Sequence, residues 1–326
     1  MFGRALAIMG WIACSAAAWA QANGPKDFAG RTELHAFQSL TLSDQQFLTG
    51  NRDGKPVTLT GQLRIAQGSG RLPLVILVHG SGGMGANIEA WARELNLIGI
   101  STFAIDGFTG RGLTAVSSNQ ALLGRLNFIV DIYQALEVVA KHPRVDAGRI
   151  ALIGFSRGGQ AALYASLARF HRLWNKSGAQ FAAYVAFYPD CATTFVDDTD
   201  IGANKVRIFH GGADDYNPIA TCKAYVGRLR AANRDVELTE YPGVHHSFDN
   251  PLGPVPPAAS PASQSVRACT VREHEGGMLI NVATKAPFSY KDECVALGPH
   301  TGADLAAAQA AMRAVTGFLR QEFKLE

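Results

Sequence analysis

Charged residues are scarce in this chain, and they are not gathered into runs. Only 17% of the 326 residues are Asp, Glu, Lys or Arg, and the formal net charge at pH 7 is +3. The sequence has no segment rich in lysine and arginine, the usual electrostatic feature of a nucleic-acid-binding surface. Apolar residues make up 47% of the chain, which is typical of a folded globular protein. We therefore expect no nucleic-acid partner and a sizeable buried core.

Long apolar runs are missing after the first twenty residues, so we expect no later segment to cross a membrane. Residues 1–20 have the pattern of a secretory signal peptide. Arg4 supplies a positive charge, Ala5–Ala18 is apolar, and Ala18-Trp19-Ala20 is a small-residue cleavage site. Cleavage after this site predicts an exported protein, either periplasmic or secreted, without stable membrane insertion. An uncleaved N-terminal anchor is the alternative.

Cysteine is rare, and the C-x-x-C pairs found in many zinc sites are absent. Of five cysteines, Cys14 lies in the expected signal peptide and four remain. An even number in an exported chain favours disulfide bonds over zinc, with three possible connectivities. The spacing favours Cys191–Cys222 and Cys269–Cys294. The first two cysteines follow successive predicted strands, so we expect them at the same end of the sheet.

A series of short apolar segments predicts β-strands, and most are continuous rather than alternating. Continuous runs of this kind are typical of strands buried on both faces of a parallel sheet. The predicted strands are residues 57–66, 74–78, 100–105, 149–153, 182–187, 206–209 and 236–241. Predicted helices are residues 87–96, 119–141, 158–170, 219–232 and 304–323. The alternation predicts one α/β domain over residues 21–326, with a mostly parallel central sheet and helices on both faces.

Residues 250–300 do not follow this alternation. Residues 250–265 are rich in Pro, Ala and Ser and predict a loop, and Gly276-Gly277 predicts a hairpin turn. We interpret this segment as an insertion of about fifty residues before the last helix. It carries the second cysteine pair.

Gly154-Phe155-Ser156-Arg157-Gly158 fits the pattern G-x-S-x-G between a predicted strand and a predicted helix. In that setting a serine is held on a strained turn at the top of an α/β sheet. A serine hydroxyl is a poor nucleophile unless a neighbouring base takes its proton. Ser156 is therefore the candidate nucleophile, and the α/β-hydrolase chain order requires an acid and then a histidine further along the chain.

The predicted strand 206–209 is followed by a glycine turn and two carboxylates, Asp214 and Asp215. The spacing Gly211-x-x-Asp214, followed by Pro218, favours Asp214 as the acid and leaves Asp215 as the alternative. Asp106 also ends a predicted strand, but it precedes Ser156 and breaks the expected order, so we expect it to be structural.

Two adjacent histidines follow the predicted strand 236–241, and they cannot both face the nucleophile. We favour His246 as the base because it directly precedes Ser247-Phe248, with His245 as the alternative. The oxyanion needs two backbone N–H groups. We expect one from Arg157 and the other from the loop after the first buried strand, with Ser81 favoured over Gly82.

Together these motifs resemble the dienelactone hydrolase family of the α/β-hydrolase superfamily. The matching segments are His79–Gly83, Asp106–Phe108 with Arg111-Gly112, Gly154–Gly159, Tyr188-Pro189, Gly211 to Asp214 with Pro218, and Tyr241–Asp249. The resemblance implies a Ser156, Asp214 and His246 triad that uses no metal and no organic cofactor. The namesake enzymes have cysteine at the elbow, are cytoplasmic and lack the insertion.

The expected activity is hydrolysis of carboxylic esters or lactones of small molecules through an acyl-enzyme. The same triad also cleaves amides or transfers acyl groups, so a serine peptidase and an acyltransferase are alternatives. A non-catalytic binding protein on the same fold is a further alternative.

Overall fold

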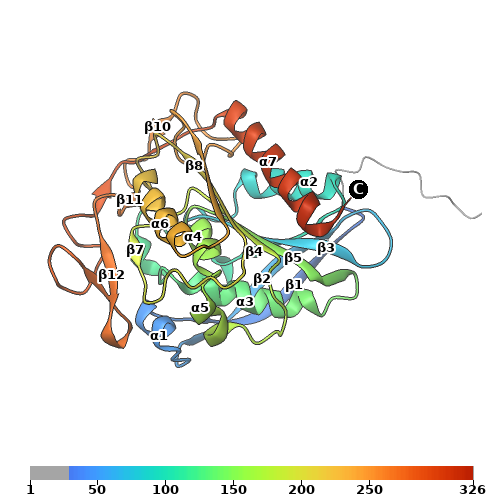
Figure 1. Ribbon diagram of the computed structural model, residues 1–326, viewed down its shortest axis with the longest axis horizontal. Coiled ribbons are helices and arrows are strands. Elements are labelled where there is room, and N and C mark those ends of the chain that lie inside the picture. The colour runs from blue at the N-terminus through green and yellow to red at the C-terminus, as the bar shows by residue number, and fades with distance from the viewer. Residues whose placement is uncertain (1–28, 326) are drawn as a thin grey trace, which may run out of the picture.

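The computed structural model describes residues 29–325, which are built around an eight-stranded sheet (Figure 1). Its strands are β1 (Arg31–Thr41), β2 (Lys55–Ile65), β3 (Leu72–Val78), β4 (Ser101–Asp106), β5 (Val145–Phe155), β6 (Ala183–Phe187), β8 (Val206–Gly211) and β9 (Val236–Tyr241). Their order across the sheet is β1-β2-β4-β3-β5-β6-β8-β9. The strands from β4 to β9 in this order pair in parallel, whereas β1 and β2 pair antiparallel. The expected α/β-hydrolase sheet is confirmed, and the expected signal peptide lies outside the described residues.

Strand β3 explains why the central strands read as continuous apolar runs. Its alternate residues Leu74, Ile76 and Val78 pack into the hydrophobic cluster on one face of the sheet. Val75 and Leu77 pack into the cluster on the other face. Because helices cover both faces, neither set of side chains reaches water, and an apolar residue suits every one of these positions.

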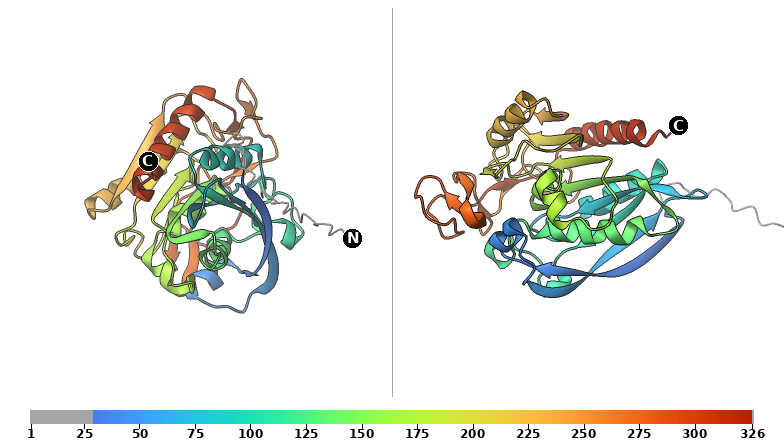
Figure 2. Two further views of the ribbon diagram at one scale, coloured as in Figure 1. Left: turned by 90° about the vertical axis from the view of Figure 1, so that its right-hand side faces the viewer. Right: turned by 60° about the horizontal axis from the view of Figure 1, so that its bottom comes forward.

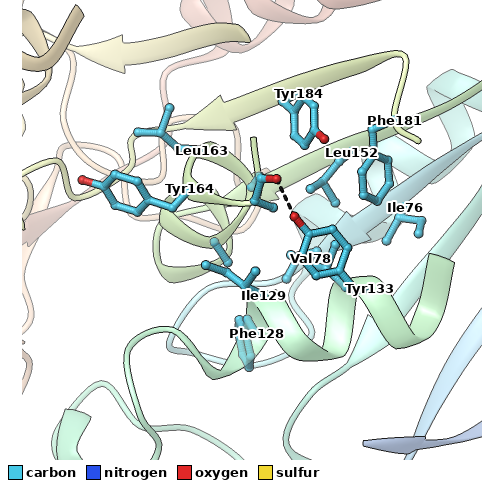
Figure 3. Close-up of a cluster of buried hydrophobic side chains, with 14 of the residues drawn as sticks. Ile76, Val78, Phe128, Ile129, Tyr133, Leu152, Leu163, Tyr164, Phe181 and Tyr184 are labelled. Atoms are coloured by element: carbon cyan, nitrogen blue, oxygen red, sulfur yellow. Dashed lines mark hydrogen bonds between the residues drawn. The ribbon is translucent and has the colours of Figure 1, made fainter. Parts of the chain in front are cut away.

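Helices cover the sheet on both sides. They are α1 (Asp44–Thr49), α2 (Ala86–Leu97), α3 (Asn127–Ala140), α4 (Arg157–Tyr164), α5 (Ala168–Trp174), α6 (Ile219–Ala231) and α7 (Leu305–Phe323). Helices α2 and α7 lie side by side on one face (Figures 1 and 2). On the other face, α3 and α4 pack on β5, where the Tyr133 hydroxyl donates to the Ala165 carbonyl at 2.7 Å (Figure 3).

The helix predicted from residue 119 begins only at Asn127, and short 3₁₀ turns precede it at Thr109–Arg111 and Gln120–Leu122. The physical reason lies in the carbonyl groups of this segment. The guanidinium of Arg157 donates hydrogen bonds to the carbonyls of Leu123 (3.0 Å) and Gly124 (3.1 Å). Side-chain contacts from another element thus replace the bonds that would continue the helix, and they form a loop beside the site.

Strand β1 and helix α1 were not among the predicted elements. Strand β1 lies at the edge of the sheet and pairs only with β2, so many of its residues are exposed and no continuous apolar run marks it. Helix α1 has six residues and begins with a capping box between Ser43 and Gln46. The helix predicted for residues 158–170 is divided into α4 and α5.

Residues 250–300 form short strands outside the main sheet. These are β10 (Ala258–Ala259), β11 (Gln264–Ser265), β12 (Val271–His274), β13 (Met278–Asn281), β14 (Ala296–Leu297) and β15 (His300–Thr301). The hairpin β12–β13 turns at the predicted glycines, through the 3₁₀ turn Glu275–Gly277. Strand β12 also pairs in parallel with β7 (Thr193–Thr194), and Figure 1 shows the hairpin beside α1.

All four cysteines of the described chain are paired. Cys191 bonds to Cys222 with an S–S distance of 2.06 Å, and Cys269 bonds to Cys294 at 2.05 Å. These are the pairs that the spacing favours, and they leave no thiolate for the alternative zinc site. Within residues 29–325, no helix is both long and apolar enough to cross a membrane.

Candidate active site

Ser156 lies at the turn between β5 and α4 with φ 55° and ψ −115°. A positive φ is unusual for a residue with a side chain, and such strain persists only where the surroundings enforce it. Here the flanking glycines are required by close backbone contacts. A Cβ at Gly158 would lie 2.2 Å from the Val78 carbonyl oxygen, and one at Gly154 would lie 2.0 Å from the Gly158 oxygen. The G-x-S-x-G pattern is therefore a packing requirement of this elbow.

Ser156, His246 and Asp214 form a continuous chain of hydrogen bonds. The Ser156 Oγ lies 2.9 Å from Nε2 of His246, and Nδ1 of His246 lies 2.7 Å from Oδ2 of Asp214. An ionised carboxylate can only accept, so Nδ1 carries the proton and Nε2 accepts from the serine hydroxyl. His246 and Asp214 are 2% and 4% exposed, which excludes water from competing for these bonds.

Each of the three side chains follows a parallel strand, β5, β8 or β9, at its carboxyl end. Because parallel strands end at the same edge, residues 90 and 32 positions apart in sequence come into contact. The second oxygen of Asp214 accepts the backbone N–H groups of Tyr216 (2.9 Å) and Asn217 (2.8 Å). Both oxygens are thus fixed, and the carboxylate cannot rotate away from His246.

Two tyrosine rings hold the imidazole of His246. Tyr216 stacks on it with ring centroids 4.6 Å apart, and Tyr188 packs edge-on at 4.6 Å. The Tyr188 hydroxyl donates to Asp249, which also accepts from Nε1 of Trp91 at 2.8 Å. Burial raises the pKa of the Asp249 carboxyl. This network fixes the loop that carries His246.

The neighbouring alternatives, His245 and Asp215, face a different part of the molecule. The His245 ring lies 5.8 Å from the ring of His300, at the end of the insertion. Asp215 accepts the backbone N–H of His300 at 2.7 Å, its Nδ1 at 2.9 Å and Nη1 of Arg267 at 3.3 Å. The structure brings Asp214 and His246 to Ser156, while Asp215 bonds to the insertion and His245 faces it.

The loop after β3 lies directly against Ser156, since a Cβ at Gly80 would be 3.1 Å from the Ser156 Cβ. His79 fixes this loop: its Nδ1 donates to the Gly80 carbonyl at 2.7 Å, and its Nε2 accepts the Gly107 N–H at 3.2 Å. Burial lowers the pKa of His79, which keeps the ring neutral. The side chain of Ser81 donates to Gln120, and the N–H of Arg157 belongs to the first turn of α4.

Asp106 has the structural role expected for it, because its Oδ1 accepts the N–H groups of Phe108 and Thr109 at 2.9 Å each. Arg111, on the following turn, forms an ion pair with Asp131 at 2.8 Å, and both are buried. These contacts fix the loop after β4 and provide no group to the Ser156 chain of hydrogen bonds.

Two cavities meet at Ser156. The larger, about 250 Å³, contains His246, the loop from Gly80 to Gly83 and several hydroxyl groups. The smaller, about 30 Å³, contains Arg157, Gln160 and Arg125. Residues of the insertion line both: Ser260, Ser263 and Thr301 in the larger cavity, and Gln264, Val266 and Tyr290 in the smaller. The insertion therefore shapes the space on either side of the serine.

Residues 59–272 match the dienelactone hydrolase family. The chain belongs to this family. No curated protein sequence matches the chain significantly. As a member of the dienelactone hydrolase family, the protein is a hydrolase.

Solved structures of other proteins are similar to this dienelactone hydrolase family member. The dienelactone hydrolase-like promiscuous phosphotriesterase P91 from metagenomic libraries is 18% identical, with a TM-score of 0.54 over 91% of this chain and 99% of that chain. Esterase Est2 of Thermogutta terrifontis is 19% identical, with a TM-score of 0.46 over 58% and 81%. Est1E of Butyrivibrio proteoclasticus is 18% identical, with a TM-score of 0.43 over 58% and 86%. At 18% identity and a TM-score of 0.54, the likeness to P91 concerns the fold alone.

Several residues at the site of this family member were not predicted from sequence. They are Gln120, Arg125, Gln160, Tyr216 and Tyr290. Arg157 was expected to contribute its backbone, but its guanidinium is also buried and reaches Gln120 and two carbonyls of the loop before α3. Two of these residues have a local signal, since Tyr216 lies two positions after the predicted acid Asp214 and Gln160 lies one helical turn after Ser156 in α4. Gln120, Arg125 and Tyr290 come from separate elements that only the tertiary structure joins.

Three side chains of types that can bind a metal ion lie together away from this site. Glu33, His35 and His142 place ligand atoms within 4.8 Å of one another. The Arg144 N–H donates to Nδ1 of His142 at 3.2 Å. A metal-bound histidine normally carries a proton on its second nitrogen, so this contact does not suit a metal ligand. Burial opposes ionisation of Glu33, but the hydrogen bond from His35 and the nearby charge of Arg31 lower its pKa.

Proposed function

We propose that the protein is a serine hydrolase that cleaves carboxylic esters or lactones of small molecules through an acyl-enzyme. The observation that carries this proposal is the buried chain from Ser156 to His246 to Asp214, with distances of 2.9 and 2.7 Å. Membership of the dienelactone hydrolase family supports it independently.

The first half-reaction forms the acyl-enzyme. Nε2 of His246 takes the proton as the Ser156 oxygen attacks the ester carbonyl, and the carbonyl oxygen becomes negatively charged. The N–H groups of Ser81 and Arg157 are the proposed donors to this oxyanion; losing one such donor typically costs about 2.7–4 kcal/mol of barrier. The intermediate collapses as the C–O bond to the alcohol breaks and His246 returns the proton to the leaving oxygen.

The second half-reaction releases the acid. His246 takes a proton from water, whose oxygen attacks the acyl carbon, and the serine oxygen leaves with the proton from His246. Asp214 holds the Nδ1–H tautomer throughout and stabilises the imidazolium. The two backbone N–H groups on the other oxygen of Asp214 support this role, because they keep the carboxylate in place.

The insertion is proposed to belong to one hydrolase domain spanning residues 21–326 and to limit the size of the substrate. Its residues line both cavities at Ser156, which supports that role. Two disulfide bonds suit an oxidising compartment, which supports the proposed export after removal of residues 1–20.

The proposal is tested with purified protein and methyl or p-nitrophenyl esters of graded acyl length. We expect turnover by the wild-type chain and a loss of at least about 10⁴-fold in kcat for Ser156→Ala and for His246→Ala. His245→Ala is the matched control, since its ring faces His300, and it should lose less than about tenfold.

Retained ester turnover in folded Ser156→Ala would exclude the proposed nucleophile. Matched amide substrates that are cleaved faster than esters would indicate a peptidase. Ester products formed from an added alcohol in preference to the free acid would indicate an acyltransferase. If the folded protein turns over none of these esters and a serine-reactive fluorophosphonate does not label Ser156, the result would indicate a non-catalytic binding protein.

A further inference from the structure

The smaller cavity beside Ser156 contains two buried donor groups without acceptors. Among the described residues, Nη1 of Arg125 and Nε2 of Gln160 have no hydrogen-bond partner. Arg125 is 3% exposed and Gln160 is 4% exposed, and both line this cavity together with Ser156. A buried donor that stays unsatisfied costs about 1–3 kcal/mol, so the pair is suited to an acceptor that arrives with a ligand.

The groups around these donors already form hydrogen bonds and packing contacts with one another. The other terminal nitrogen of Arg125 donates to Asp190, and the guanidinium lies 5.3 Å over the ring of Phe288 from the insertion. All the hydrogen bonds of Arg157 run to Gln120 and to the backbone carbonyls of Leu123 and Gly124. The free N–H group of Arg125 is therefore fixed in place before substrate binds.

The charge of the lining favours an anion over a neutral acceptor. The cavity is lined by two guanidinium groups, of Arg125 and Arg157, and by one carboxylate, of Asp190. Hydrogen bonds from a charged donor to a carboxylate are roughly twice as strong as neutral ones, and they strengthen further where water is excluded.

The proposed reaction decides which part of the substrate enters this cavity. His246 must protonate the leaving alcohol, and His246 lines the larger cavity, where the alcohol then lies. The acyl group consequently extends to the other side of Ser156, toward Arg125 and Gln160. The smaller cavity has a volume of about 30 Å³, and one water molecule needs roughly 10–15 Å³. The cavity therefore holds only a short acyl group.

We propose that the substrates are esters whose short acyl group ends in a carboxylate, held by Arg125 and Gln160. Hydrolysis of such a half-ester yields a short dicarboxylate and an alcohol, with water as the only co-reactant. The inference rests on the proposed function of Ser156 and adds the class of acyl group.

The test measures kcat/KM in a pH-stat for three methyl esters of similar size: monomethyl succinate, methyl succinamate and methyl pentanoate. Their acyl groups end in a carboxylate, a neutral amide and an alkyl chain, respectively. We expect the wild-type chain to prefer the carboxylate over the alkyl ester by on the order of 100-fold, with the amide between them.

Two substitutions address the donors without removing the buried arginine. Gln160→Glu introduces a second carboxylate into the cavity that Arg125 lines and should abolish the preference for monomethyl succinate. Gln160→Met keeps the length of the side chain, removes the donor and should reduce the preference by about tenfold. Gln180→Glu makes the same chemical change at an exposed position before β6 and should leave the preference unchanged. This position is at the amino end of the parallel strands, whereas Ser156 follows a carboxyl end.

Comparable kcat/KM for the three esters in the wild-type chain, or a preference that survives both Gln160 substitutions in folded protein, would overturn the carboxylate subsite and leave the serine hydrolase intact. Absence of turnover of every ester, together with no labelling of Ser156, would instead remove the proposed function itself. Thermal unfolding of each variant shows whether it is folded.

Discussion

At the level of single residues, Asp214 and Asp215 are adjacent in sequence and have different partners. Asp214 is buried and bonds to His246, whereas Asp215 is 38% exposed at its side chain and bonds to His300 and Arg267. We predict that Asp214→Asn lowers kcat by about 10⁴-fold, because an amide stabilises the wrong histidine tautomer. Asp215→Asn should lower it by less than about tenfold.

Ester kinetics of both variants at neutral pH check this contrast. Equal losses in the two would mean that the carboxylate of Asp214 does not orient His246.

The glycines of the elbow give a second prediction at this scale. Gly158→Ala should yield little folded protein or an inactive elbow, because its Cβ would meet the Val78 carbonyl of β3 at 2.2 Å. Gly227→Ala, in the middle of α6, has nothing within 4 Å of the new Cβ and should be neutral or stabilise by up to about 1 kcal/mol. Soluble yield and thermal unfolding compare the two, and an unaffected Gly158→Ala would contradict the packing argument.

At the level of elements, the insertion is tied to the loop after β8 by Asp215. Partial burial opposes ionisation of Asp215, but hydrogen bonds from His300 and the charge of Arg267 lower its pKa. With a depressed pKa in the folded state, the stabilising effect is complete above the unfolded value of about 4 and is lost as pH falls through the folded pKa. Because Asp215 is partly exposed, its effect is at most about 1 kcal/mol.

We therefore predict that residues 258–301 lose protection from hydrogen exchange as the pH is lowered below about 4, while β3 and β5 stay protected. Asp215→Asn should reduce protection of the insertion already at pH 6 and should remove most of its acid dependence. Identical protection of the wild-type and variant insertions across this range would show that Asp215 does not hold it.

How much of the fold and site follows from sequence depends on how local the determinants are. Short runs and fixed spacings, such as Leu74–Val78 and Gly154–Gly158, encode most of the main sheet, the elbow and the order of acid and base. The strands found in this way are β2 to β6, β8 and β9. Strand β1 is an exposed edge and has no such run. The loop before α3 adopts its form because Arg157 binds its carbonyls, and Arg125 reaches the site through that loop. Contacts of this kind join distant elements and leave no local pattern.

At the level of the whole molecule, the two disulfides stabilise different parts of the fold. Cys191–Cys222 joins the segment after β6 to α6 in the main core, while Cys269–Cys294 closes a loop within the insertion. Closing loops of 31 and 25 residues contributes about 3.5 kcal/mol each by chain entropy. We predict that Cys191→Ser with Cys222→Ser lowers the midpoint of global thermal unfolding.

The double substitution Cys269→Ser with Cys294→Ser should instead raise hydrogen exchange in residues 258–301 before the sheet unfolds. It should also alter kcat/KM for bulky esters, because the insertion lines both cavities. A lower global midpoint with an unchanged insertion would mean that the insertion does not open separately from the sheet.

The most direct measurement of the central proposal is covalent trapping of the nucleophile. A fluorophosphonate reacts with an activated serine, and peptide mass spectrometry locates the adduct. We predict one adduct, on Ser156, in the wild-type protein, slowed by at least about 10³-fold in His246→Ala and absent in Ser156→Ala. Folded protein that turns over esters yet carries no adduct on Ser156, or carries it on another residue, would contradict the proposal.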